Sequence, residues 1–213
     1  DFIYLSGILV ISALSLFLFT AVAGRQWCGY ACPQTVYTEI FLWLEKLTEG
    51  DRSARLRLDA SPMSVNKLSR KAGKQFLWLT LSLWTGFTFV GYFTPIKELS
   101  VSFINFSMGP WETFWVFFYG FATYGNAGYM REQVCKHMCP YARFQGAMFD
   151  EESLIVTYDK ARGEPRGNSP EAGDCVDCHR CVVVCPVGID IRDGQQYRCI
   201  NCALCVDACN SVM

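Results

Sequence analysis

The chain has 213 residues, of which 51% are hydrophobic and 15% aromatic, and its formal net charge is -1 at pH 7. It contains twelve cysteines but two histidines, and it has no G-x-G-x-x-G or phosphate-binding motif. These features exclude a membrane haem held by paired histidines in this segment, and they provide no site for flavin, NAD or ATP. Twelve cysteines in an extracellular setting would suggest disulfides, but free thiols that hold oxygen-sensitive metal centres indicate the reducing cytoplasmic side. Because the chain begins with Asp1 rather than methionine, we expect a fragment of a longer protein.

Three long apolar segments are predicted to cross a membrane. A helix rises 1.5 Å per residue, so about 20 residues cross roughly 30 Å of hydrocarbon. The first segment has 23 uncharged residues and the second has 21, while the third carries Glu112 near its start. A carboxylate in the first turn favours the positive end of the helix dipole, so we assign Glu112 that role rather than one in transport. The predicted spans are residues 2–24, 76–96 and 111–130.

A short cysteine motif follows the first predicted span and is repeated after the third. Each copy reads C-x3-C-P, begins within about five residues of the helix end and follows an arginine. Because proline suits the first turn of a helix, each motif is expected where a spanning helix gives way to an interfacial one. The two copies consist of Arg25, Cys28, Cys32 and Pro33, and of Arg131, Cys135, Cys139 and Pro140.

The four thiols of these motifs are candidate metal ligands. Two cysteines four residues apart on a helix share a face and can hold one soft metal ion. If the two copies pack together, within one chain or across a dimer, the four thiols form a site for copper(I), zinc or an iron-sulfur centre. His137 and Met138 lie inside the second copy as further ligand candidates. The alternatives are cysteines that pack as small apolar side chains, or a redox disulfide.

The charges of the loops predict the orientation. Residues 45–75 carry eight Lys or Arg against four acids, whereas residues 97–110 hold one base and one acid. By the positive-inside rule the first loop is cytoplasmic, and the region after the third span is cytoplasmic as well. Residues 150–213 have eleven acidic and six basic residues, a net charge of -5. We expect the basic loop to contact anionic lipid headgroups or this acidic region, and not nucleic acid.

Residues 174–210 hold the other eight cysteines in two matching C-x2-C-x2-C-x3-C runs. This spacing is typical of two-cluster bacterial ferredoxins, where three cysteines of a run hold one [4Fe-4S] cluster and the fourth crosses to the other cluster. Disulfides or zinc fit less well, since zinc sites use cysteine pairs rather than quartets. The predicted ligands are Cys175, Cys178, Cys181 and Cys209 for the first cluster, and Cys199, Cys202, Cys205 and Cys185 for the second.

The sequence therefore predicts an α-helical membrane protein with three transmembrane helices and interfacial helices, followed by an α+β ferredoxin-like domain. The predicted domains are residues 1–149 and 150–213. Residues 159–173, rich in glycine, proline and charge, are the predicted linker between the membrane part and the clusters.

The block RQWCGYACPQTVYTEIF, together with the second C-x3-C-P motif and the two-cluster ferredoxin pattern, closely resembles the CcoG/FixG/RdxA family of bacterial cytochrome oxidase accessory proteins. The resemblance spans nearly the whole chain. It implies a multi-pass protein of the bacterial cytoplasmic membrane that reduces Cu(II) to Cu(I) for the copper centre of cbb-type cytochrome c oxidase. The implied partners are the lipid bilayer, a cytoplasmic electron donor and a copper chaperone or transporter of oxidase assembly.

The interpretation based on this resemblance is a one-electron oxidoreductase in which the C-x3-C-P thiols bind copper and are the catalytic groups. NapH- and NosR-type electron-transfer proteins carry similar motifs. The second hypothesis is therefore an electron conduit that feeds a periplasmic reductase and never binds copper.

Overall fold

The computed structural model describes residues 2–149, 152–167 and 169–212, and within these ranges it is helical, with no β-strand. The α+β expectation for residues 150–213 is therefore not met. Between its short helices this region bonds its backbone through local turns rather than strand ladders. Residues 150 and 151, where the second predicted domain begins, and residue 168 of the predicted linker lie outside the described ranges. The chain forms two compact units, Asp1–Thr35 with Glu132–Met213, and Val36–Arg131.

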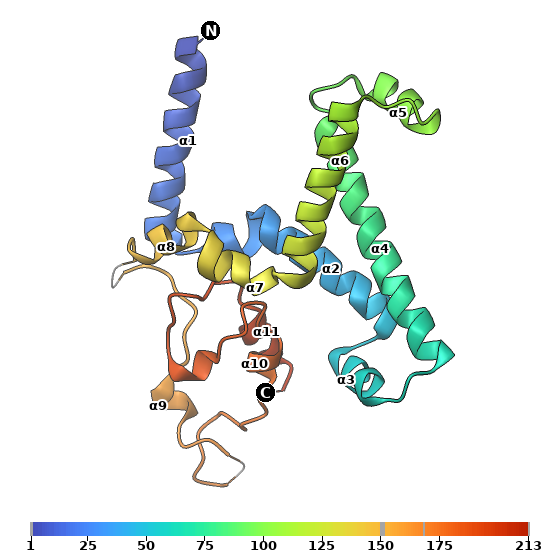
Figure 1. Ribbon diagram of the computed structural model, residues 1–213. Coiled ribbons are helices and arrows are strands. Elements are labelled where there is room, and N and C mark those ends of the chain that lie inside the picture. The colour runs from blue at the N-terminus through green and yellow to red at the C-terminus, as the bar shows by residue number, and fades with distance from the viewer. Residues whose placement is uncertain (1, 150–151, 168, 213) are drawn as a thin grey trace. The chain divides into compact units, whose positions relative to one another are not determined.

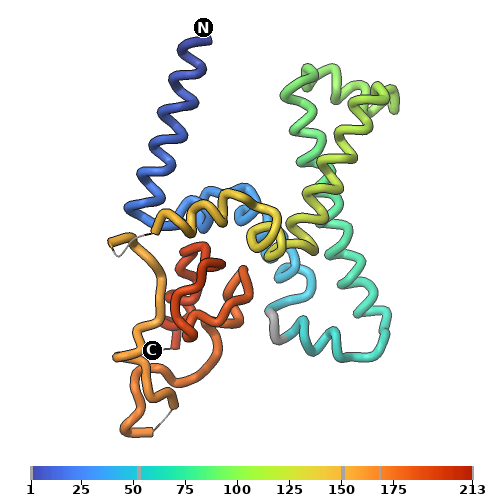
Figure 2. Tube along the Cα trace, turned by 60° about the vertical axis from the view of Figure 1, so that its left-hand side comes forward, coloured from blue at the N-terminus to red at the C-terminus, as the bar shows by residue number. Residues whose placement is uncertain are grey.

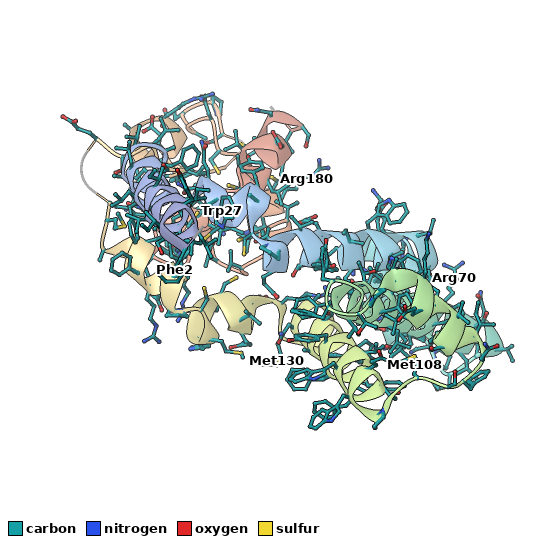
Figure 3. All side chains as sticks on the ribbon, turned by 90° about the horizontal axis from the view of Figure 1, so that it is seen from above. Phe2, Trp27, Arg70, Met108, Met130 and Arg180 are labelled. Atoms are coloured by element: carbon teal, nitrogen blue, oxygen red, sulfur yellow. The ribbon has the colours of Figure 1, made fainter. Side chains whose placement is uncertain are left out.

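The first unit begins with α1 (Phe2–Ala23), which corresponds to the first predicted span. It is the one helix in the described part of the chain that is long and apolar enough to cross a membrane. The side chains of α1 stand out around its ribbon, beginning at Phe2 (Figure 3). Thr20 is the one buried residue of this helix. Gly24 ends the helix with φ +66°, a conformation that favours glycine. A Cβ at Gly24 would lie 2.4 Å from the Leu154 carbonyl oxygen, so the chain passes tightly here.

The other elements of the first unit are short. Helices α10 and α11, one after each ferredoxin-type cysteine loop, lie next to each other (Figure 1). Along the chain, α2 and α7 each begin in one unit and end in the other. The elements are η1 (Trp27–Ala31), the start of α2 (Pro33–Glu49), the end of α7 (Arg131–Gln133), η3 (Val134–Met138), α8 (Pro140–Gly146), α9 (Lys160–Gly163), α10 (Arg180–Val183), η4 (Ile191–Asp193) and α11 (Leu204–Asn210).

The second unit is built on α4 (Val65–Val90) and α6 (Pro110–Thr123), which run side by side (Figures 1 and 2). They approach closely because both carry glycine at the contact: a Cβ at Gly86 would lie 2.2 Å from the Val116 carbonyl oxygen and 2.9 Å from the Gly120 nitrogen. The elements of this unit are the rest of α2, α3 (Arg52–Ala60), α4 (Val65–Val90), α5 (Ile96–Ile104), α6 (Pro110–Thr123) and η2 (Tyr124–Tyr129).

These helices relate differently to the second and third predicted spans. Helix α4 starts eleven residues before residue 76 with a polar segment and ends at Val90, so its apolar stretch is shorter than predicted. The third predicted span is divided into the 14-residue α6 and the π-helical η2. Neither α4 nor α6 meets the length and composition of a membrane-crossing helix, so the described residues do not confirm three spans.

Basic side chains of the predicted basic loop, among them Arg55 and Lys74, lie against two buried carboxylates four residues apart on α2, Glu45 and Glu49. Lys74 lies 3.0 Å from Glu49. Arg131, which follows the third predicted span, lies 2.8 Å from Glu45. Buried carboxylates need such partners, so this network fixes α2, α3 and α4 within the unit. Contact of the loop with lipid headgroups or with the acidic region stays a prediction.

Candidate functional site

The two C-x3-C-P motifs adopt the same backbone conformation. In each motif a π-helical turn ends at the second cysteine, whose N–H donates to a carbonyl five residues earlier: Cys32 to Trp27, and Cys139 to Val134, both at 2.8 Å. Helices α2 and α8 then begin at the prolines, as predicted. Proline suits this position because it lacks the N–H that a first-turn residue cannot use within the helix. The sequence repeat is therefore also a structural repeat.

The four motif thiols are neighbours within one chain. Cys28 interacts electrostatically with Cys32 and Cys135, and Cys135 interacts with Cys32 and Cys139. In the described ranges, however, no group of three or more His, Cys, Asp or Glu side chains is arranged to hold a metal ion. The structure thus brings the thiols together without forming a coordination shell. The other two candidate ligands of the second motif, His137 and Met138, are exposed.

Cys28 is the most enclosed of these thiols, with 7% of its surface exposed. Its Sγ donates to Gln145 Oε1 at 2.8 Å, and the same oxygen accepts a hydrogen bond from Arg25 Nε at 3.3 Å. Burial raises the pKa of Cys28 to about 11, while Arg25 acts in the opposite direction. At neutral pH the thiol is therefore protonated, and a bound cation would be needed to ionise it.

Arg25 is a functional candidate to which the sequence analysis assigned no role. The side chain is 2% exposed, and its Nη1 donates to the carbonyl oxygens of Tyr197 and Cys199, the latter at 3.0 Å. The arginine that precedes the second motif, Arg131, pairs with Glu45 instead. The two arginines therefore differ in environment although they occupy the same place in the repeat.

The first C-x3-C-P motif packs directly on the second ferredoxin-type run. A Cβ at Gly29 would lie 2.9 Å from the Ile200 carbonyl oxygen and 3.1 Å from the Cys202 Cα, so only glycine allows this approach. The Tyr30 hydroxyl donates to the Cys202 carbonyl at 3.0 Å. Cys28, Val187 and Ile200 form a small buried core against which Cys135, Cys185 and Cys202 pack. Thiols of both motifs thus lie beside cysteines assigned to the second cluster.

The two ferredoxin-type runs share an unusual backbone. In the first run Asp177 and His179 have φ of 52° and 56°, and in the second run Asn201 and Ala203, at the equivalent positions, have φ of 54° and 59°. Left-handed residues at fixed positions curve each loop, and such loops turn successive N–H groups to one side, as in anion-binding concavities. A curved loop of this kind is suited to enclosing a cluster with its sulfurs and thiolates.

One hollow contains all four cysteines predicted for the second cluster, including Cys185, which comes from the first run. This is the arrangement that exchange of the fourth ligand requires. The rest of the lining is mostly apolar and includes Val187 and Ile191. Burial raises the pKa of Cys205 to about 11, with the neighbouring thiols adding to the shift, so metal binding is needed to ionise these sulfurs. These residues fit a [4Fe-4S] cluster in donor number and chemistry.

The cysteines assigned to the first cluster are more open to solvent. Cys178 and Cys209 are exposed, and Cys175 and Cys181 are half-buried. The buried Arg192 lies beside this run and pairs with two acids, Asp177 and Asp190. Arg192 Nη2 donates to Asp190 at 2.6 Å, and Nη1 donates to Asp177 at 2.5 Å. Arg192 Nη2 also lies 2.9 Å from His179 Nδ1.

Comparison with known families agrees with this geometry. Residues 130–171 and 166–213 match the 4Fe-4S dicluster domain family, and residues 5–49 match a 4Fe-4S binding domain family. The matches cover both C-x3-C-P motifs as well as the two ferredoxin-type runs. Together with the cysteine hollow, they define an iron-sulfur electron-transfer protein.

Relatives of the whole chain identify the family. The chain is 47% identical to nitrogen fixation protein FixG of Rhizobium meliloti, over 100% of the chain and 42% of FixG. It is 46% identical to protein RdxA of Cereibacter sphaeroides, over 100% of the chain and 46% of RdxA. The ferredoxin-type protein NapH of Haemophilus influenzae is 25% identical over 94% of the chain and 65% of NapH. No solved structure matches.

The chain belongs to the FixG/RdxA family. It spans less than half the length of these FixG and RdxA relatives.

Proposed function

We propose that this chain is the electron-transferring part of a membrane-bound cupric reductase. Electrons from a cytoplasmic donor pass through the two ferredoxin-type runs to the C-x3-C-P thiols, where Cu(II) takes up one electron and becomes Cu(I). The observation that supports this route best is the contact of Gly29 and Tyr30 with residues 200–202. It joins the electron-carrying part and the thiol part of the chain without an intervening segment.

The motif residues suit a copper substrate. Thiolates are soft ligands and retain Cu(I) in preference to harder ions. As copper binds, the protons of the motif thiols leave to water, and Arg25 favours the thiolate form of Cys28. The [4Fe-4S] clusters, when bound, supply single electrons at potentials that their surroundings tune. In this proposal the site is formed by thiols of one chain, and the pairwise interactions of Cys28 and Cys135 with the other motif thiols support it.

The membrane arrangement in this proposal has three spans, with α1 followed by the apolar part of α4 and by α6 with η2. Large apolar side chains stay exposed on these two helices, among them Phe76, Trp84 and Phe121, and lipid is the natural environment for such a surface. The loop charges place the clusters on the cytoplasmic side of the bacterial inner membrane. The family resemblance suggests delivery of Cu(I) to cbb-type oxidase assembly through a copper chaperone or transporter.

The second candidate is an electron conduit that feeds a separate periplasmic reductase and binds no copper. The similarity to the ferredoxin-type protein NapH favours it. In a conduit the motif thiols would only pack against the second run or form a redox disulfide.

Metal analysis of the anaerobically purified full-length protein separates these functions. We expect about eight irons per chain, four for each cluster, and one or two bound coppers after incubation with Cu(II). Eight irons without copper would favour the conduit. About twelve irons without copper would mean that the motif thiols hold a further cluster.

A pair of variants tests the thiol site. The double substitution Cys28→Ser and Cys139→Ser should keep the iron and lose copper binding and Cu(II) reduction. The control is Cys178→Ser, which should lower the iron content and keep copper binding. Full copper binding and reduction by the double variant would overturn the proposal.

A further inference from the structure

The surroundings of the two ferredoxin-type runs differ in charge, although the runs share the same cysteine spacing. Beside the second run lies the guanidinium of Arg25, buried and bonded to the Tyr197 and Cys199 carbonyls and to Gln145. All three acceptors are neutral, and no carboxylate among the described residues pairs with Arg25. The nearby acid Glu132 is neutralised by Lys136 at 2.6 Å. The second run therefore has an uncompensated buried positive charge.

Beside the first run the buried cation is paired. Arg192 is also buried, but it pairs with the half-buried Asp190 and with the exposed Asp177. Asp190 alone balances the charge of Arg192, so the first run has no uncompensated buried cation to match Arg25. Arg180, the other arginine of the first run, is exposed and hydrogen-bonded to Ser211. Water screens an exposed charge, so it affects a neighbouring site far less than a buried one.

We propose that the two clusters differ in reduction potential, and that the second cluster, held by Cys199, Cys202, Cys205 and Cys185, has the higher potential. Arg25 sets this difference. The difference in turn directs electrons to the C-x3-C-P thiols. An added electron is a negative charge, so a buried cation without an acidic partner favours it more than a buried cation that is already paired with a carboxylate. Arg25 is a positioning and tuning residue, since it acts through the ligand backbone at Cys199. The direction of flow rests on the proposed function.

Accessibility agrees with this direction. Cys178 and Cys209 of the first set are exposed, so a soluble donor can approach the first cluster. The cysteines of the second set are all half-buried and line a hollow next to the first C-x3-C-P motif, which contacts residues 200–202 through Gly29 and Tyr30. Electrons would enter at the more exposed cluster of lower potential and leave from the less exposed cluster of higher potential. The step between the clusters is then energetically downhill.

The test is a redox titration of the copper-free, anaerobically purified full-length protein, followed by the EPR signals of the reduced clusters. Two separate midpoints are expected, differing by at least tenfold in reduction equilibrium, or about 59 mV for a one-electron couple. Ligand variants assign them: Cys202→Ser should alter or abolish the higher midpoint, and Cys178→Ser the lower. Coincident midpoints, or the opposite assignment, would overturn the inference.

Substitutions at Arg25 test the cause. Arg25→Gln should lower the higher midpoint by at least the same tenfold, and Arg25→Lys, which keeps the charge, should restore most of it. Arg180→Gln is the matched control and should leave both midpoints unchanged. A purely structural role would be seen as lost iron or a broadened signal, without a shift confined to one midpoint.

A second substitution tests the same role while keeping the Arg25 side chain. The substitution Gln145→Glu supplies the missing carboxylate at a side chain already 3.3 Å from Arg25 Nε, so it should lower the same midpoint even if Arg25→Gln fails to fold. A higher midpoint that stays in place would refute the role of Arg25. Cu(II) reduction is assayed separately. Equal midpoints with intact Cu(II) reduction would reject the inference alone, whereas unequal midpoints without Cu(II) reduction would reject the proposed function alone.

Discussion

Replacing Gly29 with alanine should separate the first C-x3-C-P motif from the second cysteine run. The new methyl group would meet the Ile200 carbonyl oxygen at 2.9 Å, and the Cys202 Cα and nitrogen at 3.1 and 3.2 Å. All three are backbone atoms, which cannot turn aside as a flexible side chain can. Overpacking of this kind costs about 1–3 kcal/mol. At about 1.4 kcal/mol for each factor of ten, opening of the contact should become roughly 5- to 150-fold more frequent.

Amide hydrogen exchange of the iron-loaded full-length protein measures this opening, because exchange reports local unfolding on the scale of minutes to hours. Residues 199–205 should exchange faster in Gly29→Ala by that factor. The control is Gly146→Ala in α8, whose Cβ would meet no atom closer than the Tyr197 Cβ at 4.0 Å and should leave exchange unchanged. If Gly29→Ala exchanged as slowly as the wild type with its iron retained, the close packing of motif and run would be refuted.

Three further predictions concern other parts of the chain. Glu45→Gln removes a buried charge that several basic side chains share, so it should lower the free energy of unfolding by about 3 kcal/mol. The loss is measured as a lower denaturant midpoint. A shift no larger than that of the exposed Glu98→Gln would contradict this prediction. Gly86→Ala should destabilise the α4–α6 pair by about 1–3 kcal/mol in thermal unfolding, whereas Gly125→Ala, with no atom within 4 Å of its Cβ, should not; equal effects would argue against the close helix contact. Burial raises the Cys28 pKa above its ordinary 9.0 to about 11. Between these values the folded state binds more protons than the unfolded state. The stability that this thiol contributes is therefore complete below about pH 9 and falls as the pH rises toward 11. Alkylation of copper-free Cys28 should accelerate over the same range, and a rate that levels off near pH 9 would count against the raised pKa.

Features set by local spacing could be predicted from the sequence. The cysteine periods of the two runs dictate loops that curve around a cluster, and the structure places Cys185 in one hollow with the second run, as ligand exchange requires. The uncharged stretch of residues 2–24 similarly corresponds to α1. The repeat of C-x3-C-P suggested that four thiols converge; thiols of the two motifs interact in pairs, but no three of the described thiols are arranged to hold a metal ion. In each case a short sequence pattern, a cysteine spacing or an uncharged stretch, determines the local structure.

Features that depend on distant residues could not be predicted in the same way. The packing of Gly29 on residues 200–202, and the neutral environment of Arg25, join segments with no shared pattern. The pairing of the basic loop did leave a signal, because Glu45 and Glu49 are four residues apart and share a face of α2. The strands expected of a ferredoxin-like domain are not seen in the described residues. Whether a segment forms a strand depends on the neighbours it packs against, so a local sequence pattern does not decide it.

The bond from Arg25 to the Tyr197 carbonyl also imposes an order on the protein's synthesis. Its two partners are 172 residues apart in the chain. At 5–20 residues per second, the segment that carries Arg25 waits roughly 10 to 35 s on the ribosome before its acceptor is made. During that interval α1 can enter the membrane, but the guanidinium at its end has only water or lipid headgroups as partners. Closure of the second cysteine run against the segment after α1 can therefore only follow the synthesis of both partners, long after α1 has left the ribosome.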